Sequence, residues 1–351
     1  MAAGDIALGP NDEVHALMYL SGFGGGWSLL NGASTVSGSG YVRAVAKYNS
    51  TATSLLWHNA YSSNDVNGVG GIDVDRHGQI YFLASIVPNR TVLGTLSSST
   101  NTNYLIWLRP NGSFHKKLVS ASQSSAFSAI DEVQAIDSNT IYLAGHAYGD
   151  SLTFAKRTIY SLTADPLKSF NFIAELKDFD TLTWARSTSH QGYGQVGTYR
   201  MTINGDFLYF SSPQNSPTFS FAGFTRSSFT RTVVSKFDRL GNLLWYLPIQ
   251  SVNAVFINPM GTQDMVYSSE YTMSLTLSPF VLPTISGTGR SFMARTFDYS
   301  ITRGEVASGP YCAGDTLLIP YERAGDFDTA NTFIAELSDD RGEFFGGQRE
   351  L

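Results

Sequence analysis

A short apolar pattern recurs six times along the chain, and this repeat constrains the fold more than any other feature of the sequence. Its clearest copies are Phe172–Leu176 and Phe333–Leu337, which both read Phe-Ile-Ala-Glu-Leu. Looser copies are centred on positions 46, 106, 235 and 294, so successive copies are separated by 60, 68, 61, 59 and 41 residues. A period of about 60 residues indicates a series of similar structural units.

Each unit is expected to contain four short strands, named a to d in chain order. Residues 71–119 illustrate the pattern, with strand-like segments at 71–75, 79–85, 104–108 and 114–119. Turn-forming residues such as Pro110-Asn-Gly separate them. No segment carries a sustained helical stripe of apolar residues. The sequence therefore predicts an all-β fold, a six-bladed β-propeller of four-stranded antiparallel blades.

The whole chain, residues 1–351, is interpreted as one propeller domain. Its blades are expected at about 5–59, 69–120, 130–188, 194–250, 252–306 and 310–351. Residues 5–17 align without a gap to 71–83, which places strand a of the first blade at the N-terminus. The last blade has a strand d of its own at 343–349. We therefore expect no closing blade shared by the two chain ends, and ring closure by packing of the first blade against the sixth.

Three tryptophans occupy equivalent places after the repeated pattern: Trp57, Trp184 and Trp245, each preceded by an apolar residue two positions earlier. Equivalent positions in a radial repeat meet equivalent neighbours. We expect these side chains to be largely buried between neighbouring blades.

Several stretches match the pattern of a known repeat, in which Asp-x-x-Gly-Asn precedes an Ile/Val-Tyr strand, and Phe-Val-Ala-Lys-Leu precedes Leu-x-Trp. They are Asp75–Tyr81, Ile141–Gly145, Val233–Trp245 and Phe333–Leu337. The unit thus resembles the SBBP-type β-propeller repeat of bacterial and archaeal exported proteins, over nearly the whole chain. The resemblance implies the propeller fold and no particular activity, because that family shares no catalytic set.

Composition excludes several classes of protein. With 42% hydrophobic and 15% charged residues, the chain is not intrinsically disordered. Its net charge of −6 argues against a nucleic-acid partner. The single cysteine, Cys312, excludes a disulfide framework. No apolar run is long enough to span a membrane, and the N-terminus lacks the features of a classical signal peptide. We expect cytoplasmic synthesis and a final place in a virion or outside the cell.

Catalytic and metal-binding motifs are weak. There is no Gly-x-Ser-x-Gly elbow, and the histidines show no metal-ligand spacing. Asp73-Val-Asp75 resembles the start of a calcium loop but lacks its closing glutamate, and Asp326-Phe-Asp328 is similar. We expect no metal and no cofactor, and favour a protein that is not an enzyme. Carboxylates that converge from different blades remain an open possibility.

Long loops between strands b and c mark one side of the predicted propeller, at about 20–38, 86–103, 146–170, 212–230 and 270–290. The candidate binding residues are Phe154, Phe221, Phe224, Arg226, Phe229 and Phe280 in these loops, and His190 in the 187–195 loop. Loop aromatics either anchor a partner or pack beneath their own loop. Both interpretations stay open.

Two classes of function follow. The favoured one is a non-catalytic structural or binding propeller, a component of a virion or surface appendage. It would dock through its b–c loops to another protein or to a surface, such as one that carries a glycan. The alternative is a glycan-active enzyme or lectin with its site at the channel mouth. That alternative requires polar and acidic residues that converge on the axis from several blades.

Overall fold

The structure is a computed structural model. It describes residues 2–22, 40–93, 102–122, 129–154, 156–161, 169–188, 200–213, 218–221, 224–227, 232–249, 256–260, 264–271, 275–277, 280–282, 290–297, 300–303 and 321–324. In these residues all regular structure is β-strand, arranged in antiparallel sheets. The expectation of an all-β fold with four-stranded antiparallel units is confirmed.

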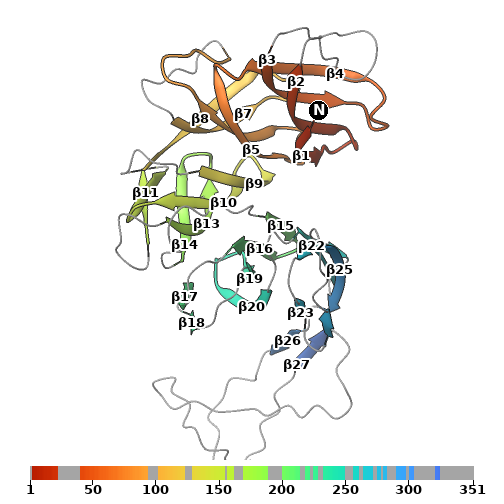
Figure 1. The fold of residues 1–351 in the computed structure, drawn as a ribbon, viewed down its shortest axis with the longest axis vertical. Coiled ribbons are helices and arrows are strands. Elements are labelled where there is room, and N and C mark those ends of the chain that lie inside the picture. Colours follow the sequence, from red (N-terminus) through yellow and green to blue (C-terminus); the bar gives the residue numbers. More distant parts are fainter. Residues whose placement is uncertain are drawn as a thin grey trace, which may run out of the picture.

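Four sheets repeat one arrangement, in which consecutive strands lie side by side (Figure 1). Sheet 1 contains β1 (Ala2–Leu8), β2 (Val14–Gly22), β3 (Gly40–Tyr48) and β4 (Leu55–Ser62). Sheet 2 contains β5 (Val66–Val74), β6 (Ile80–Ile86), β7 (Thr102–Leu108) and β8 (Phe114–Ser122). Sheet 3 contains β9 (Ala129–Asp137), β10 (Thr140–Tyr148), β13 (Ser169–Lys177) and β14 (Thr181–Ser187). Sheet 4 contains β15 (Arg200–Asn204), β16 (Phe207–Pro213), β19 (Thr232–Asp238) and β20 (Leu243–Ile249).

The C-terminal part departs from this arrangement. Sheet 5 has three strands, β21 (Phe256–Met260), β22 (Asp264–Tyr271) and β25 (Arg290–Phe297). The next strand, β26 (Ser300–Arg303), pairs with β27 (Tyr321–Ala324) and not with β25. Residues 325–351, which include the expected strands c and d of a sixth blade, lie outside the described part of the chain. No closed ring of sheets is present among the described residues.

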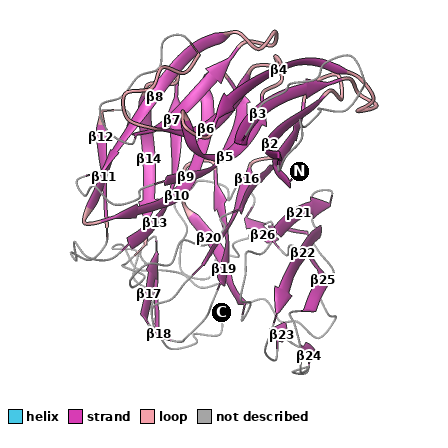
Figure 2. Cartoon of the chain, turned by 45° about the horizontal axis from the view of Figure 1, so that its top comes forward, coloured by secondary structure: helices cyan, strands magenta, loops and turns pink. Residues whose placement is uncertain are grey.

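The first strands of successive sheets contact one another, in the order β1, β5, β9, β15 and β21. We call these five the inner strands. The sheets follow one another in chain order around them (Figures 1 and 2). Apolar clusters fill the junctions between sheets: Leu17 and Val45 of sheet 1 pack with Ile72 and Ile80 of sheet 2.

Sheets 3, 4 and 5 each insert a hairpin between their second and third strands. The hairpins are β11 (Ser151–Phe154) with β12 (Arg157–Tyr160), β17 (Thr218–Phe221) with β18 (Phe224–Ser227), and β23 (Leu275–Leu277) with β24 (Phe280–Leu282). Strand β11 pairs with β8, so the first hairpin extends sheet 2 to six strands. Strand β23 likewise contacts β20 of the preceding sheet. Two of the b–c segments thus contact the last strand of the preceding sheet.

Two of the repeated tryptophans bind the turn between strands c and d of the next sheet. Trp57 Nε1 donates to the carbonyl of Pro110 at 3.0 Å, and its ring covers Gly112. Trp184 Nε1 donates to the carbonyl of Arg239 at 3.1 Å, and its ring covers Gly241. The expectation that they pack between sheets is confirmed, although both side chains are half-buried.

Trp245 is also half-buried, and its ring centroid lies 6.3 Å from that of Tyr209 within its own sheet. Its expected contact with the following sheet would involve the turn at 298–299, outside the described residues.

At the junction between sheets 2 and 3, the strand position of the tryptophans holds a lysine, and the turn of the next sheet supplies the aromatic ring. Lys116, which takes the register position of the tryptophans, donates to the carbonyl of Asp178. The turns of sheets 2 and 4 carry Gly112 and Gly241 at positive φ, whereas the turn of sheet 3 has no glycine and carries Asp178 and Phe179 at positive φ. Phe179 is completely buried and lies 5.4 Å from Trp107 between ring centroids. The aromatic ring therefore comes from the turn and not from the strand.

Candidate functional site at the inner strands

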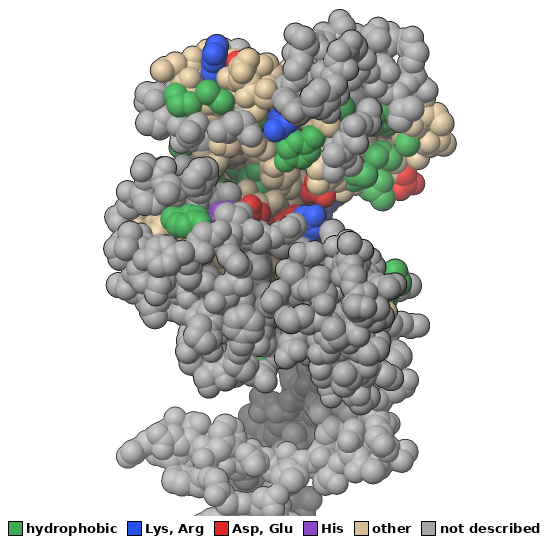
Figure 3. All heavy atoms as spheres, viewed as in Figure 1, with side chains coloured by type: hydrophobic (Ala, Val, Ile, Leu, Met, Phe, Trp, Pro, Cys, Tyr) green, Lys and Arg blue, Asp and Glu red, His purple; other side chains and the backbone are tan. Residues whose placement is uncertain are grey.

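Acidic side chains gather on three neighbouring inner strands. They are Asp5 on β1, Asp73 on β5, and Asp131 with Glu132 on β9. Arg200 on β15 is the basic residue beside them. Acidic, basic and histidine side chains are visible together at the narrowing below the N-terminal sheets (Figure 3). This is the convergence of carboxylates that the enzyme or lectin alternative requires.

Three of the acids bond across a junction between sheets. Asp5 Oδ2 accepts the N–H of Ile72 at 3.0 Å, which ties β1 to β5. Asp73 Oδ2 accepts the N–H of Ala135 at 2.6 Å, which ties β5 to β9. Glu132 forms an ion pair with Arg200, which ties β9 to β15. These carboxylates hold neighbouring sheets together, and such bonds compete with any bond to a ligand.

Asp131 makes its bond within sheet 3. Its Oδ2 lies 2.8 Å from Nδ1 of His146, a residue that is 1% exposed. A carboxylate that orients a histidine is one half of a catalytic arrangement, but it needs a nucleophile in reach of the ring.

Burial dominates the electrostatics of the cluster, because desolvation disfavours the charged form of an acid. It raises the pKa of Asp73 to about 7, with the charges of Asp5 and Asp75 adding to the effect. It raises the pKa of Glu132 to about 8 against the attraction of Arg200. The pKa values of Asp5 and Asp131 are raised by the same cause. The cluster therefore carries less negative charge at neutral pH than its four carboxyl groups suggest.

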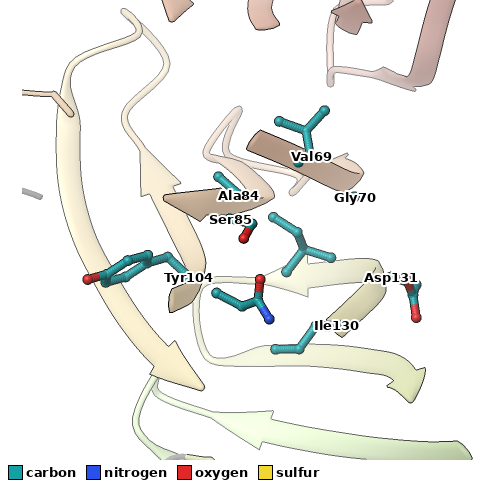
Figure 4. Close-up of a pocket in the computed structure, with 10 residues that line it drawn as sticks. Val69, Gly70, Ala84, Ser85, Tyr104, Ile130 and Asp131 are labelled. Atoms are coloured by element: carbon teal, nitrogen blue, oxygen red, sulfur yellow. The ribbon is translucent and has the colours of Figure 1, made fainter. Parts of the chain in front are cut away.

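A pocket of about 110 Å³ lies beside this cluster, between sheets 2 and 3. Its polar wall is formed by Ser85 and Asn103, and its apolar wall by Val69, Leu83 and Ile130. The Asp131 carboxyl group lies apart from the labelled side chains of sheet 2 (Figure 4). The volume is enough for about three or four waters and is below the range of about 300–1,000 Å³ typical of ligand pockets.

The two aspartates of the calcium-like segment have structural partners. Asp75 Oδ1 accepts the N–H groups of His77 and Gln79, and Asp75 Oδ2 accepts the hydroxyl of Tyr81. Asp75 thus closes the turn between β5 and β6. In the part of the chain that is described, no group of three or more histidine, cysteine, aspartate or glutamate side chains could hold a metal ion.

The residues proposed from the loops do not come together in one site. Phe154 lies in β11, is 2% exposed and belongs to the core between sheets 2 and 3. For Phe154 the structure therefore corrects the exposed-anchor interpretation: β11 pairs with β8 and turns this ring inward. In the register of the β17–β18 hairpin, Phe221 is the backbone partner of Phe224, and Arg226 is that of Phe219.

Phe280 lies in β24, paired with Leu277. Phe229 and His190 fall outside the described residues, as do Cys312 and the Asp326–Asp328 segment. Sequence patterns pointed to Asp73 but not to Asp5, Asp131, Glu132 or Arg200. The only signal that these share is their place in the first strand of each repeat.

None of the described residues forms a helix long and apolar enough to cross a membrane. Comparison with protein-family models and with curated protein sequences gives no match. The similarity to the SBBP-type repeat therefore rests on the residues quoted above.

Proposed function

We propose that the chain is a non-catalytic scaffold that docks onto another protein or a surface through the b–c hairpins of sheets 3 to 5. A virion or an extracellular appendage is the setting in which we place it. The surface in this proposal includes one that carries a glycan. The proposal is supported by the first hairpin, β11–β12, which has one side packed in the core and an exposed aromatic side chain on the other.

The β11–β12 hairpin carries this argument. On its inner side Leu152 and Phe154 are 1% and 2% exposed and belong to the core. On the opposite face Tyr160 is 67% exposed. Ser187 on β14 donates to the carbonyl of Tyr160 at 2.5 Å, so both sheets hold the hairpin. A rigid support for an exposed tyrosine suits recognition, because little entropy is lost when it binds.

The six-bladed ring is part of the same proposal. Ile6 and Leu8 on β1 are 58% and 63% exposed, whereas their counterparts on β5, Ile72 and Val74, are 2% and 7% exposed. Ile72 and Val74 are covered by sheet 1. We place the C-terminal residues 310–351 against β1 in the same way. Electron micrographs of the purified chain would test this, and an open arc would contradict it.

The docking proposal is tested by comparing hydrogen exchange in the isolated chain with exchange in the native assembly. We expect slower exchange at 157–160 and 218–227 in the assembly. Tyr160→Ala should weaken assembly at least about tenfold, as loss of a central aromatic does. Leu240→Ala is the matched control, since Leu240 is 72% exposed but lies on a c–d turn. Protection confined to the c–d turns would refute the proposal.

The enzyme or lectin alternative keeps one supporting observation, the acids on three inner strands. Against it, Asp5, Asp73, Asp131 and Glu132 each have a partner within the chain. Titration of neutral and acidic oligosaccharides, followed by NMR, distinguishes the two functions. Perturbed signals at Asp131 and Ser85 would favour the alternative.

A further inference from the structure

The inner strands β5 and β9 approach each other more closely than side chains allow. A Cβ atom on Gly70 would lie 3.0 Å from the carbonyl oxygen of Ile130, and one on Gly71 would lie 3.1 Å from Cα of Glu132. Glycine at both positions lets the two backbones meet. The junction between sheets 2 and 3 is therefore narrow at this level.

Asp73 spans this narrow junction, because its Oδ2 accepts the N–H of Ala135 on β9 at 2.6 Å. The bond is the one described side-chain link from β5 to the backbone of β9. It is available to a protonated or an ionised carboxyl group. The two forms differ in what else they require, since the ionised form needs a cation or water nearby.

The charged groups around Asp73 do not supply that cation. Asp75 on its own strand and Asp5 on β1 are both acids. On β9 and β15, Glu132 and Arg200 form an ion pair with each other. Asp131 is bonded to His146 of β10. On β6, Tyr81 lies opposite Asp73 and donates its hydroxyl to Asp75. Within the described residues, Asp73 thus has two acids, two charged pairs and a bonded tyrosine around it.

We infer that the junction between β5 and β9 is a pH-responsive joint, tight while Asp73 is protonated and loosened when Asp73 ionises. An ionised Asp73 is repelled by Asp5 and Asp75 and is poorly solvated in the closed junction, so its ionisation favours separation of the strands. The inference does not depend on the proposed docking function. It assigns the inner-strand acids a conformational role.

The direction with pH follows from the raised pKa of Asp73, about 7 compared with 3.8 for an unperturbed aspartate. The folded state binds the proton more tightly than the open state, so this group stabilises the joint fully below about pH 4. Its contribution declines as pH rises from about 4 to 7 and is lost above that value. About three pKa units allow a change of up to about a thousandfold in the opening equilibrium.

Hydrogen exchange of the full chain at pH 5, 6, 7 and 8, corrected for intrinsic rates, tests the joint. Protection of residues 129–137, which include Ala135, should fall at least about tenfold from pH 5 to pH 8. Asp73→Asn keeps an oxygen that can accept the Ala135 N–H and cannot ionise, so its protection should change with pH at least about tenfold less than that of the wild type; the pH dependence that remains is that of Glu132 on β9. Asp206→Asn is the matched control, because the Asp206 side chain is 93% exposed. It should behave as the wild type does.

Equal pH dependence in the wild type and Asp73→Asn would overturn the inference, as would protection that rises with pH. A second measurement covers the case in which the variant does not fold. The carboxyl ¹³C shift of Asp73 in the wild-type chain should titrate with a midpoint near 7. A midpoint near 4 would overturn the inference without any substitution.

Discussion

Gly241 offers a direct measure of how much the tryptophan contacts hold neighbouring sheets together. It has a φ of +78° in the turn between β19 and β20. A Cβ atom at this position would lie 2.6 Å from Cδ2 and Cε3 of Trp184. Gly241→Ala therefore strains the backbone and also displaces the Trp184 ring from the turn.

The expected cost has two parts. Alanine in the left-handed region costs about 1–2 kcal/mol. Displacement of the ring removes the hydrogen bond from Trp184 Nε1 to the Arg239 carbonyl, worth about 0.5–1.5 kcal/mol, together with its packing. Gly205→Ala provides the control: φ is +55° and no atom lies within 4 Å of the added Cβ, so only the backbone cost applies. We expect Gly241→Ala to exceed it by about 1–2 kcal/mol.

Urea denaturation followed by tryptophan fluorescence measures both variants. In a Trp184→Ala background the extra cost of Gly241→Ala should disappear, because the two residues share one contact. Equal costs for the two glycine variants in the wild-type background would show that Trp184 does not stabilise the junction between sheets 3 and 4.

Three further outcomes are expected. Phe179→Ala should lower the free energy of unfolding by about 3–5 kcal/mol, since Phe179 is fully buried; a urea-measured loss below 1 kcal/mol would contradict its role. Leu152→Ala should cost about 2–5 kcal/mol and speed exchange of the paired residue Ser122 in β8, whereas exposed Thr153→Ala should stay within about 0.5 kcal/mol. Burial lowers the pKa of His15 to about 4, so the folded state keeps this side chain neutral and the protein loses stability as pH falls from 6.5 to 4. Thermal melting of His15→Phe across that pH range, with Asp73→Asn measured alongside, should not show this loss of stability. An unchanged loss would refute the assignment.

The strands of sheet 2 could be predicted because their signals are local. Segments expected at 79–85, 104–108 and 114–119 correspond to β6, β7 and β8. Alternating or continuous apolar residues and a turn such as Pro110-Asn-Gly define each of them. The turn contains Gly112 with a φ of +81°, as its sequence predicts. Local chemistry was sufficient for the repeat unit.

The hairpins and the inner-strand acids could not be predicted in this way, because their partners are distant in sequence. Strand β11 has only four residues and is stabilised by pairing with β8, which lies about thirty residues earlier. The candidate site joins residues 5, 73, 131, 132 and 200, one or two from each repeat. A repeat predicts that such positions lie on one axis but not which side chains bond across it.

Phe179 takes over the role that a tryptophan has at the other two junctions among sheets 1 to 4. Each of these junctions between sheets is therefore filled by an aromatic ring, but the ring does not always come from the same position of the repeat. Phe179 has a φ of +56°, which costs about 1–2 kcal/mol for a residue with a side chain. Burial of its ring removes about 150–250 Å² from water, worth about 4–6 kcal/mol. The gain outweighs the strain, so a phenylalanine is tolerated at positive φ in this turn, whereas the turns of sheets 2 and 4 use glycine. Lys116 can then replace the tryptophan, because the ring that fills the junction is supplied by the opposite sheet.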